Sequence, residues 1–232
     1  MINKVQMKIK KETTFLFFFT LFQLCICQNK ISSKGGFISP ISKSFEGQEP
    51  EAYWIWDSGD PNPKNYYLHI RKTINLNKLI KEAKVYVSAF SFAEIYINGI
   101  YIDRVPTNPD PEYQTYEKID ISRYLKLGKN TIAALVFNAG EGLHHRMNGR
   151  GGFFFQAKII DFNERIIKLN SDKSWLIAKA IAWNNNTDHR QVDHTIGRKE
   201  KYDARLSFEN WEQNYYDDSD WKNATEIGVP PI

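Results

Sequence analysis

Cysteine is nearly absent from this chain of 232 residues, which contains only Cys25 and Cys27. Both lie close to the N-terminus, so the chain after them offers no disulfide, no thiolate nucleophile and no cysteine-ligated zinc. We therefore expect its stability to come from a hydrophobic core alone. With 42% hydrophobic and 14% aromatic residues, the composition is that of a globular protein with such a core.

An excess of one charge is also missing once the N-terminal segment is set aside. The whole chain has 31 Lys and Arg against 27 Asp and Glu, a formal net charge of +4. Residues 1–27 hold four of the lysines and one glutamate, which leaves 27 basic and 26 acidic residues in the rest. A nearly neutral chain gives no electrostatic reason to expect nucleic acid or an anionic membrane as a partner.

Long hydrophobic runs are limited to one, Phe15 to Cys27, which follows four lysines. Thirteen residues are too few for a transmembrane helix of ~20 residues. A basic region followed by such a run is typical of a secretory signal peptide. We therefore expect residues 1–27 to be a signal peptide cleaved before Gln28, and the protein to be secreted or periplasmic without a transmembrane anchor. A lipid anchor is disfavoured, because Leu24 and Ile26 precede the cysteines where a small residue is expected.

After the signal peptide, a polar segment is followed by residues that favour β-strands. Residues 28–50 are rich in Ser, Lys and Gly and are expected to form a flexible leader. Afterwards, short aromatic and β-branched runs alternate with turn residues, which predicts an all-β fold, an antiparallel β-sandwich over residues 51–206. Residues 207–232 are expected to close the module and lead to a further one. Strands are expected at 66–74, 84–90, 131–138, 152–160 and 174–178, and one or two helical turns at 121–127.

The strongest local signal is a hairpin over residues 94–103 (EIYINGIYID). Asn98 and Gly99 tolerate the positive φ that both central residues of a type I′ turn require. We expect these two residues to be structural, and the isoleucines to share one face of the hairpin. The expected pairs are Ile97 with Ile100, Tyr96 with Tyr101, and Ile95 with Ile102.

Two groups of histidines raise the question of a metal. They are His144-His145 in a glycine-rich loop, and the Asp188-His189 and Asp193-His194 pairs. Neither group has the i, i+4 spacing with a glutamate that zinc hydrolases use, so we expect no transition metal and solvated loop histidines.

Calcium is the second metal to weigh, since the run DSGDPNP places Asp57, Asp60 and Asn62 close together. Their oxygens suit Ca²⁺, and sandwich proteins often carry a structural calcium ion. Asp, Asn, Gly and Pro are also what a tight turn requires. We favour the turn, expect no cofactor, and leave a structural calcium as the alternative.

Tryptophans are the candidate carbohydrate-binding residues, because an exposed indole can stack on a sugar ring. Trp54 and Trp56 share a strand face by period two, and Trp183 lies in an asparagine-rich loop. Core packing is the alternative for each of them. The polar loop around residues 140–152 would lie at one end of the sandwich, where ligands are often held. The candidate residues are therefore Trp54, Trp56, Trp183, His144, His145 and Arg146.

Catalytic motifs are missing. The acidic residues are scattered over turns, and no spacing isolates the pair of carboxyl groups that a glycosidase needs. The run Asp217–Asp220 is best explained as a turn or an N-cap, and no G-x-S-x-G element is present. The sequence therefore predicts no catalytic residue.

Several runs carry a resemblance to a known family. They are WIW at Trp54, NYYLHIRKTINL from Asn65, VYVSAFSFAEIYINGIYID from Val85, DISRYLKLGKNTIAALVFN from Asp120, EKYDARLSFENW from Glu200, and DDSDW from Asp217 with a closing VPPI. Over most of residues 51–232 the chain thereby resembles the N-terminal β-module of bacterial α-L-rhamnosidases, a galactose-binding-like jelly roll of glycoside hydrolases. The YDAR run followed by DDS-x-W and PPI points to the rhamnosidases in particular.

The resemblance implies that this module accompanies a catalytic domain and contains no catalytic site of its own. In that family, acidic residues on a large α/α-barrel downstream hydrolyse the glycosidic bond, and this chain ends at Ile232, where the next module would begin. We carry over no catalytic residue and expect Asp203 and Arg205 to be structural or interdomain. The implied function is that of a secreted, non-catalytic module that positions the missing catalytic domain or contacts a polysaccharide, such as a rhamnose-containing glycan. The alternative is a free-standing carbohydrate-binding or surface-interaction protein.

Overall fold

The computed structural model describes residues 36–38, 49–105, 114–142, 149–189 and 197–229. By its internal contacts the chain divides into two units, Met1–Lys34 and Gly35–Ile232, and every described residue lies in the second. The expected signal peptide and most of the expected leader fall outside the described residues. Within the described part, no helix is long and apolar enough to cross a membrane.

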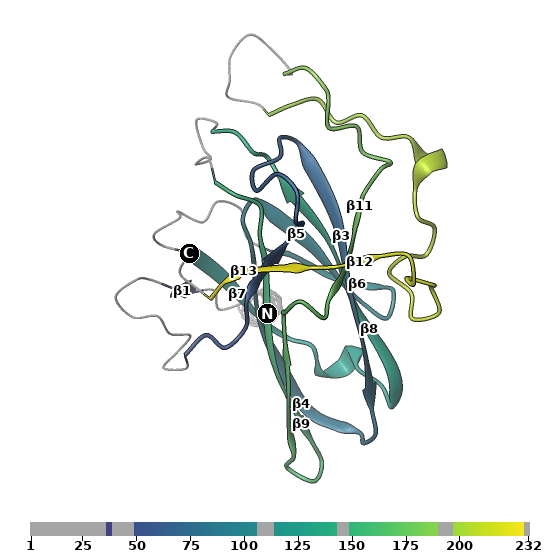
Figure 1. The fold of residues 1–232 in the computed structure, drawn as a ribbon. Helices are drawn as coiled ribbons and strands as arrows, with labels where there is room; N and C mark the ends of the chain where they lie inside the picture. The colour runs from purple at the N-terminus through teal and green to yellow at the C-terminus, as the bar shows by residue number, and fades with distance from the viewer. Residues whose placement is uncertain (1–35, 39–48, 106–113, 143–148, 190–196, 230–232) are drawn as a thin grey trace, which may run out of the picture. The chain divides into compact units, whose positions relative to one another are not determined.

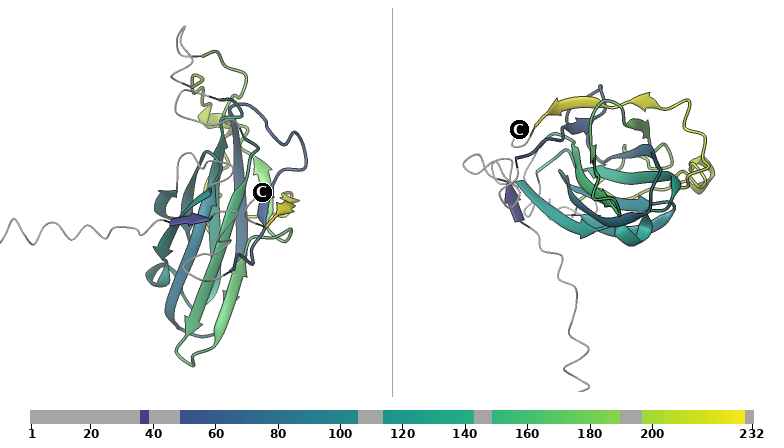
Figure 2. Two further views of the ribbon diagram at one scale, coloured as in Figure 1. Left: turned by 90° about the vertical axis from the view of Figure 1, so that its left-hand side faces the viewer. Right: turned by 90° about the horizontal axis from the view of Figure 1, so that it is seen from below.

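The second unit consists of strands that form two antiparallel sheets facing each other (Figures 1 and 2). The seven-stranded sheet has the order β1-β7-β4-β9-β2-β13, with β10 also paired to β9. The six-stranded sheet has the order β12-β11-β3-β8-β5-β6. This arrangement confirms the predicted all-β sandwich. The strands are β1 (Gly36–Ile38), β2 (Trp54–Trp56), β3 (Tyr66–Leu76), β4 (Ile80–Ala89), β5 (Phe92–Ile97), β6 (Ile100–Val105), β7 (Gln114–Asp120), β8 (Gly128–Asn138), β9 (Phe153–Asp161), β10 (Ile166–Asn170), β11 (Leu176–Lys179), β12 (Lys222–Asn223) and β13 (Thr225–Gly228).

The strands that the sequence predicts include β3, β4, β8, β9 and β11. In β9, Phe153 and Phe155 belong to the main core between the sheets, whereas Phe154 packs in a second cluster with Trp54 and Tyr86. Two short 3₁₀ turns, η1 (Ser122–Tyr124) and η2 (Ala204–Leu206), complete the described structure. The first of them lies within the predicted helical turn.

The predicted hairpin is confirmed, with one correction to its register. Asn98 and Gly99 have φ of 52° and 81°, as a type I′ turn requires. The two pairs next to the turn are as expected, but Ile95 lies opposite Asp103 rather than Ile102. A β-bulge therefore adds one residue to β6, which ends the strict alternation of the isoleucines along that strand.

The end of the described chain contributes to both sheets. Leu176 of β11 pairs with Asn223 of β12, and Trp56 of β2 pairs with Thr225 of β13. Ala224, between the two short strands, is buried in the main core. Residues 222–228 thus connect the two layers, while the domain boundaries expected at residues 51 and 207 stay predictions.

A segment near the C-terminus lies over the outer face of the six-stranded sheet (Figure 1). We call residues 202–221 the covering segment. Beneath it, β3 has buried residues on both faces: alternate positions enter the main core, and Tyr67, His69 and Arg71 point to the outer side. The covering segment buries His69 and Arg71, and Trp183 covers Tyr67. Six consecutive residues of β3 are therefore buried, where an open sheet face would expose every second one.

Candidate functional site

Trp54 and Trp56 belong to the core rather than to a binding surface. Both side chains are 0% exposed. Trp54 packs 5.7 Å from the ring of Phe154, and Trp56 packs 6.0 Å from the ring of Tyr66, in different clusters. The two indoles thus pack in separate clusters and offer no surface on which a sugar could stack. This corrects their assignment as candidate stacking residues.

The loop candidates His144, His145 and Arg146 lie outside the described residues, as do Asp193 and His194. Residues 140–142 and 149–152 of this loop are described. Glu141 receives hydrogen bonds from Arg198, with Nε–Oε1 at 3.0 Å and Nη2–Oε2 at 3.2 Å. This bidentate ion pair links the start of the β8–β9 loop to the segment that contains Arg198.

Trp183 lies on a short antiparallel ribbon that follows β11. Residues 182–184 run alongside residues 201–203, with Trp183 paired to Tyr202. Backbone hydrogen bonds hold the two runs together, from Asn184 N to Lys201 O and from Asp203 N to Ala182 O, both at 2.9 Å. The ribbon thus brings the asparagine-rich run and the YDAR run side by side, although the two are separate runs in the sequence.

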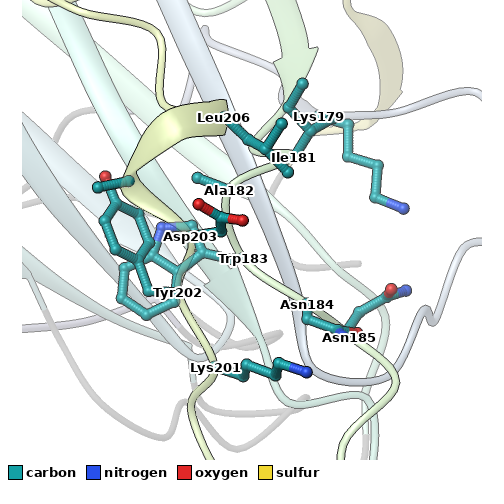
Figure 3. A pocket seen from close by; sticks show the side chains of 11 residues that line it. Lys179, Ile181, Ala182, Trp183, Asn184, Asn185, Lys201, Tyr202, Asp203 and Leu206 are labelled. Atoms are coloured by element: carbon teal, nitrogen blue, oxygen red, sulfur yellow. The ribbon is translucent and has the colours of Figure 1, made fainter.

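A pocket of about 560 Å³ lies against this ribbon (Figure 3). Its size falls in the range of small-molecule binding sites. In the view of Figure 3, the rings of Trp183 and Tyr202 lie on one side, and Asn184, Asn185 and Lys201 lie across from them. The lining residues are Lys179, Ile181, Ala182, Trp183, Asn184, Asn185, Lys201, Tyr202, Asp203, Ala204 and Leu206.

The aromatic rings at the pocket form a row that ends at the surface. The indole of Trp183 stacks on Tyr67 of β3, with centroids 4.2 Å apart and planes 14° apart. Tyr202 packs on the same indole at 4.8 Å and 54°. Trp183 is partly buried between its neighbours, whereas Tyr202 is 48% exposed. Tyr202 is therefore the ring most available to a ligand, a residue that the sequence analysis did not select.

Asp203 is held by Arg205, two residues further on. Arg205 donates to the carboxylate from Nε at 2.9 Å and from Nη2 at 2.6 Å, and its backbone N–H donates at 3.1 Å. These hydrogen bonds lower the pKa of the Asp203 carboxyl below its usual range, so the carboxylate is ionised and paired at neutral pH. Asp203 also caps η2, so one side chain shapes the backbone and carries the ion pair.

The pocket does not have the composition of a glycosidase active site. Retaining and inverting glycosidases both need two carboxyl groups that flank the scissile bond. Asp203 is the sole carboxylate among the described residues that line the pocket. Its pairing with Arg205 also opposes the raised pKa that a general acid needs.

Of the residues considered for calcium, Asp60 forms the turn that the sequence favours. Asp60 accepts a hydrogen bond from Asn62 N at 2.9 Å, which is the Asx turn that the composition favours. Asp57 accepts from the Tyr66 hydroxyl at 2.9 Å. Each carboxylate thus has a hydrogen-bond partner within the chain. No group of three or more His, Cys, Asp or Glu residues suited to a metal occurs in the described ranges.

Comparison with known proteins identifies relatives over most of the described unit. A family model described as "Alpha-L-rhamnosidase N-terminal domain" matches residues 78–231. An α-L-rhamnosidase of Formosa agariphila is 26% identical over 177 residues, which is 68% of this chain and 17% of the relative. The chain thus spans less than a fifth of the length of that curated relative.

Solved structures give the same picture. The GH78 family rhamnosidase of Bacillus sp. GL1 aligns with a TM-score of 0.67 and 28% identity over 77% of this chain and 18% of that chain. The α-L-rhamnosidase from Dictyoglumus thermophilum aligns with a TM-score of 0.61 and 26% identity over 78% of this chain and 21% of that chain. In each case the aligned part is a small share of a longer enzyme chain.

Proposed function

The chain belongs to the α-L-rhamnosidase N-terminal domain family, and from this premise we propose that it is a non-catalytic module of a secreted α-L-rhamnosidase-like glycoside hydrolase that contacts carbohydrate. The observation that carries the proposal is the pocket beside the exposed ring of Tyr202. An aromatic ring stacks on the apolar face of a sugar, and the amides of Asn184 and Asn185 can bond its hydroxyl groups. Export would depend on residues 1–27, and catalysis on a downstream domain that this module positions.

Tyr202→Ala is expected to weaken carbohydrate binding about five- to tenfold, because it removes the stacking surface. The full chain is titrated with rhamnose-containing and other oligosaccharides while tryptophan fluorescence is followed, since Trp183 lies in contact with Tyr202. The matched control is Tyr215→Ala, because Tyr215 is 70% exposed and does not line the pocket. Equal loss in both variants would remove Tyr202 from the site. Flat titrations of the unmodified chain would overturn carbohydrate contact and leave the positioning role.

The absence of turnover is a separate expectation. With a single, ion-paired carboxylate at the pocket, the 232-residue chain is expected to release no aryl alcohol from an aryl α-L-rhamnoside above the buffer rate. A chromogenic assay checks this at high protein concentration. Turnover that falls in Asp203→Asn would place an active site at the pocket and contradict the non-catalytic assignment.

A further inference from the structure

Positive charge lines the pocket. Lys179 and Lys201 are both exposed and come from different segments, the end of β11 and the returning run of the ribbon. In Figure 3 they lie at separate edges of the pocket, with Asn184 and Asn185 beside Lys201. Two ammonium groups at one small pocket raise the local concentration of anions.

Negative charge at the same place is already paired. The Asp203 carboxylate receives three hydrogen bonds from Arg205, whose own side chain is 87% exposed. The neighbouring Glu200 does not line the pocket and accepts a hydrogen bond from the Tyr67 hydroxyl at 3.4 Å. The two lysines therefore have no unpaired carboxylate among the described lining residues to balance them.

We propose that this pocket selects anionic sugars, those with a carboxylate or a sulfate group, over neutral ones. The aromatic surface of Tyr202 accepts the ring, and the asparagine amides bond its hydroxyl groups. Lys201 binds the anionic substituent, and Lys179, whose ammonium lies 5.5 Å from the ring centre of Tyr66, adds positive charge at the other edge of the pocket. The inference rests on the proposed carbohydrate contact and adds the chemical class of the ligand. An ammonium group is a point charge without the planar fork of arginine, so it accepts carboxylate and sulfate alike.

The sharpest test keeps the sugar and removes only its charge. The full chain is titrated with a galacturonate trisaccharide and with its fully methyl-esterified form, and in parallel with a sulfated galactan oligosaccharide and its desulfated form. We expect each charged form to bind about tenfold more tightly at low salt, because an exposed contact between opposite charges contributes about a three- to fivefold gain. The preference should shrink as sodium chloride is raised to ~0.5 M, where charges are screened over a few ångströms.

The variants assign the preference to the lysines. Lys179→Gln and Lys201→Gln should each remove part of the preference for the charged sugar and leave the neutral form unaffected. Lys158→Gln is the matched control, since Lys158 is an exposed lysine on β9 of the other sheet. The Lys158→Gln variant should prefer the charged sugar over the neutral form as strongly as the unmodified chain does.

The outcomes separate the two proposals. Equal affinity for the charged and neutral forms overturns the anionic selectivity and leaves the carbohydrate contact standing. A preference that survives both lysine substitutions places the anion elsewhere and overturns this site. Binding of none of the four sugars by the folded chain overturns both proposals. A gain confined to the carboxylate pair or to the sulfate pair identifies the source of the anion.

Discussion

Arg71→Met is expected to lower the free energy of unfolding by about 3–5 kcal/mol, the range for removal of one partner of a buried ion pair. Arg71 is 0% exposed, and its Nε lies 2.8 Å from Asp218 Oδ2. Its Nη1 also donates to the backbone carbonyls of Trp211 and Gln213, the latter at 3.2 Å. A methionine fills much of the same volume but leaves these three acceptors without their donor.

Aromatic packing adds to this expected loss. The guanidinium lies 5.1 Å from the ring centre of Tyr216 and 5.8 Å from that of Trp221. Cations over aromatic rings gain energy that a neutral thioether does not recover. Since every partner of the guanidinium belongs to residues 211–221, the substitution should loosen the covering segment before the sandwich itself.

Urea denaturation measures the effect, with exposure of the tryptophans as the signal. Lys81→Met is the control, since it breaks an ion pair with Glu164 at the surface and should leave the midpoint unchanged. The urea midpoint of Asp218→Asn should lie between those of Arg71→Met and Lys81→Met. Asp218 is partly exposed, and in this variant Arg71 keeps its hydrogen bonds to the backbone carbonyls. A midpoint for Arg71→Met as high as that for Lys81→Met would contradict the role given to the buried guanidinium.

The elements that the sequence predicts correctly are those encoded by neighbouring residues. The type I′ turn at Asn98-Gly99 fixes the hairpin because φ preference and pairing act over ten residues. Strands β3, β8 and β9 follow from aromatic and β-branched residues gathered in single runs. The bulge opposite Ile95 was missed, since an extra residue in β6 changes no composition and needs only a local change of backbone angles.

The covering segment could not be predicted, because it depends on contacts between distant parts of the chain. Arg71 and Asp218 are 147 positions apart, and nothing in either local run specifies the other. The run Asp217–Asp220 was expected to form a turn, and Asp217 does accept from Ser219 N at 3.1 Å. Its neighbour Asp218 instead binds the buried arginine, a role visible only after folding.

The site was predicted in part for the same reason. Trp183 was selected from its asparagine-rich loop, and it does line the pocket. Tyr202 was missed because its position opposite Trp183 results from pairing across the ribbon. The signal available in the sequence was the YDAR run itself, which places an aromatic ring next to a paired Asp and Arg. Trp54 is buried against residues of its own sheet and Trp56 against Tyr66 of the other sheet, contacts that no spacing rule reveals.

Acid should destabilise the fold through His69 well before the carboxylates titrate. His69 lies under the covering segment, with the ring of Trp211 at 4.2 Å and that of Phe208 at 5.6 Å. Burial lowers the pKa of its imidazole to about 3, against about 6.5 in an unfolded chain. The folded protein therefore keeps the ring neutral while the unfolded chain binds a proton, so this contribution is complete above pH 6.5 and is lost as the pH falls toward 3.

The free energy of unfolding is expected to be about 2 kcal/mol lower at pH 5 than at pH 7, because His69 takes up a proton in the unfolded chain but not in the folded protein. Urea denaturation at pH 7, 6 and 5 measures it, above the range in which Asp and Glu titrate. His69→Phe preserves the aromatic packing and should make the free energy of unfolding nearly independent of pH in this range. The readout is therefore the slope of that free energy against pH, and not the absolute stability of the variant. His189→Gln is the control, and the dependence on pH should persist in it, because His189 pairs with Arg198 and does not lie under the covering segment. An unchanged slope in His69→Phe would assign the acid sensitivity to other groups and separate it from the burial of this histidine.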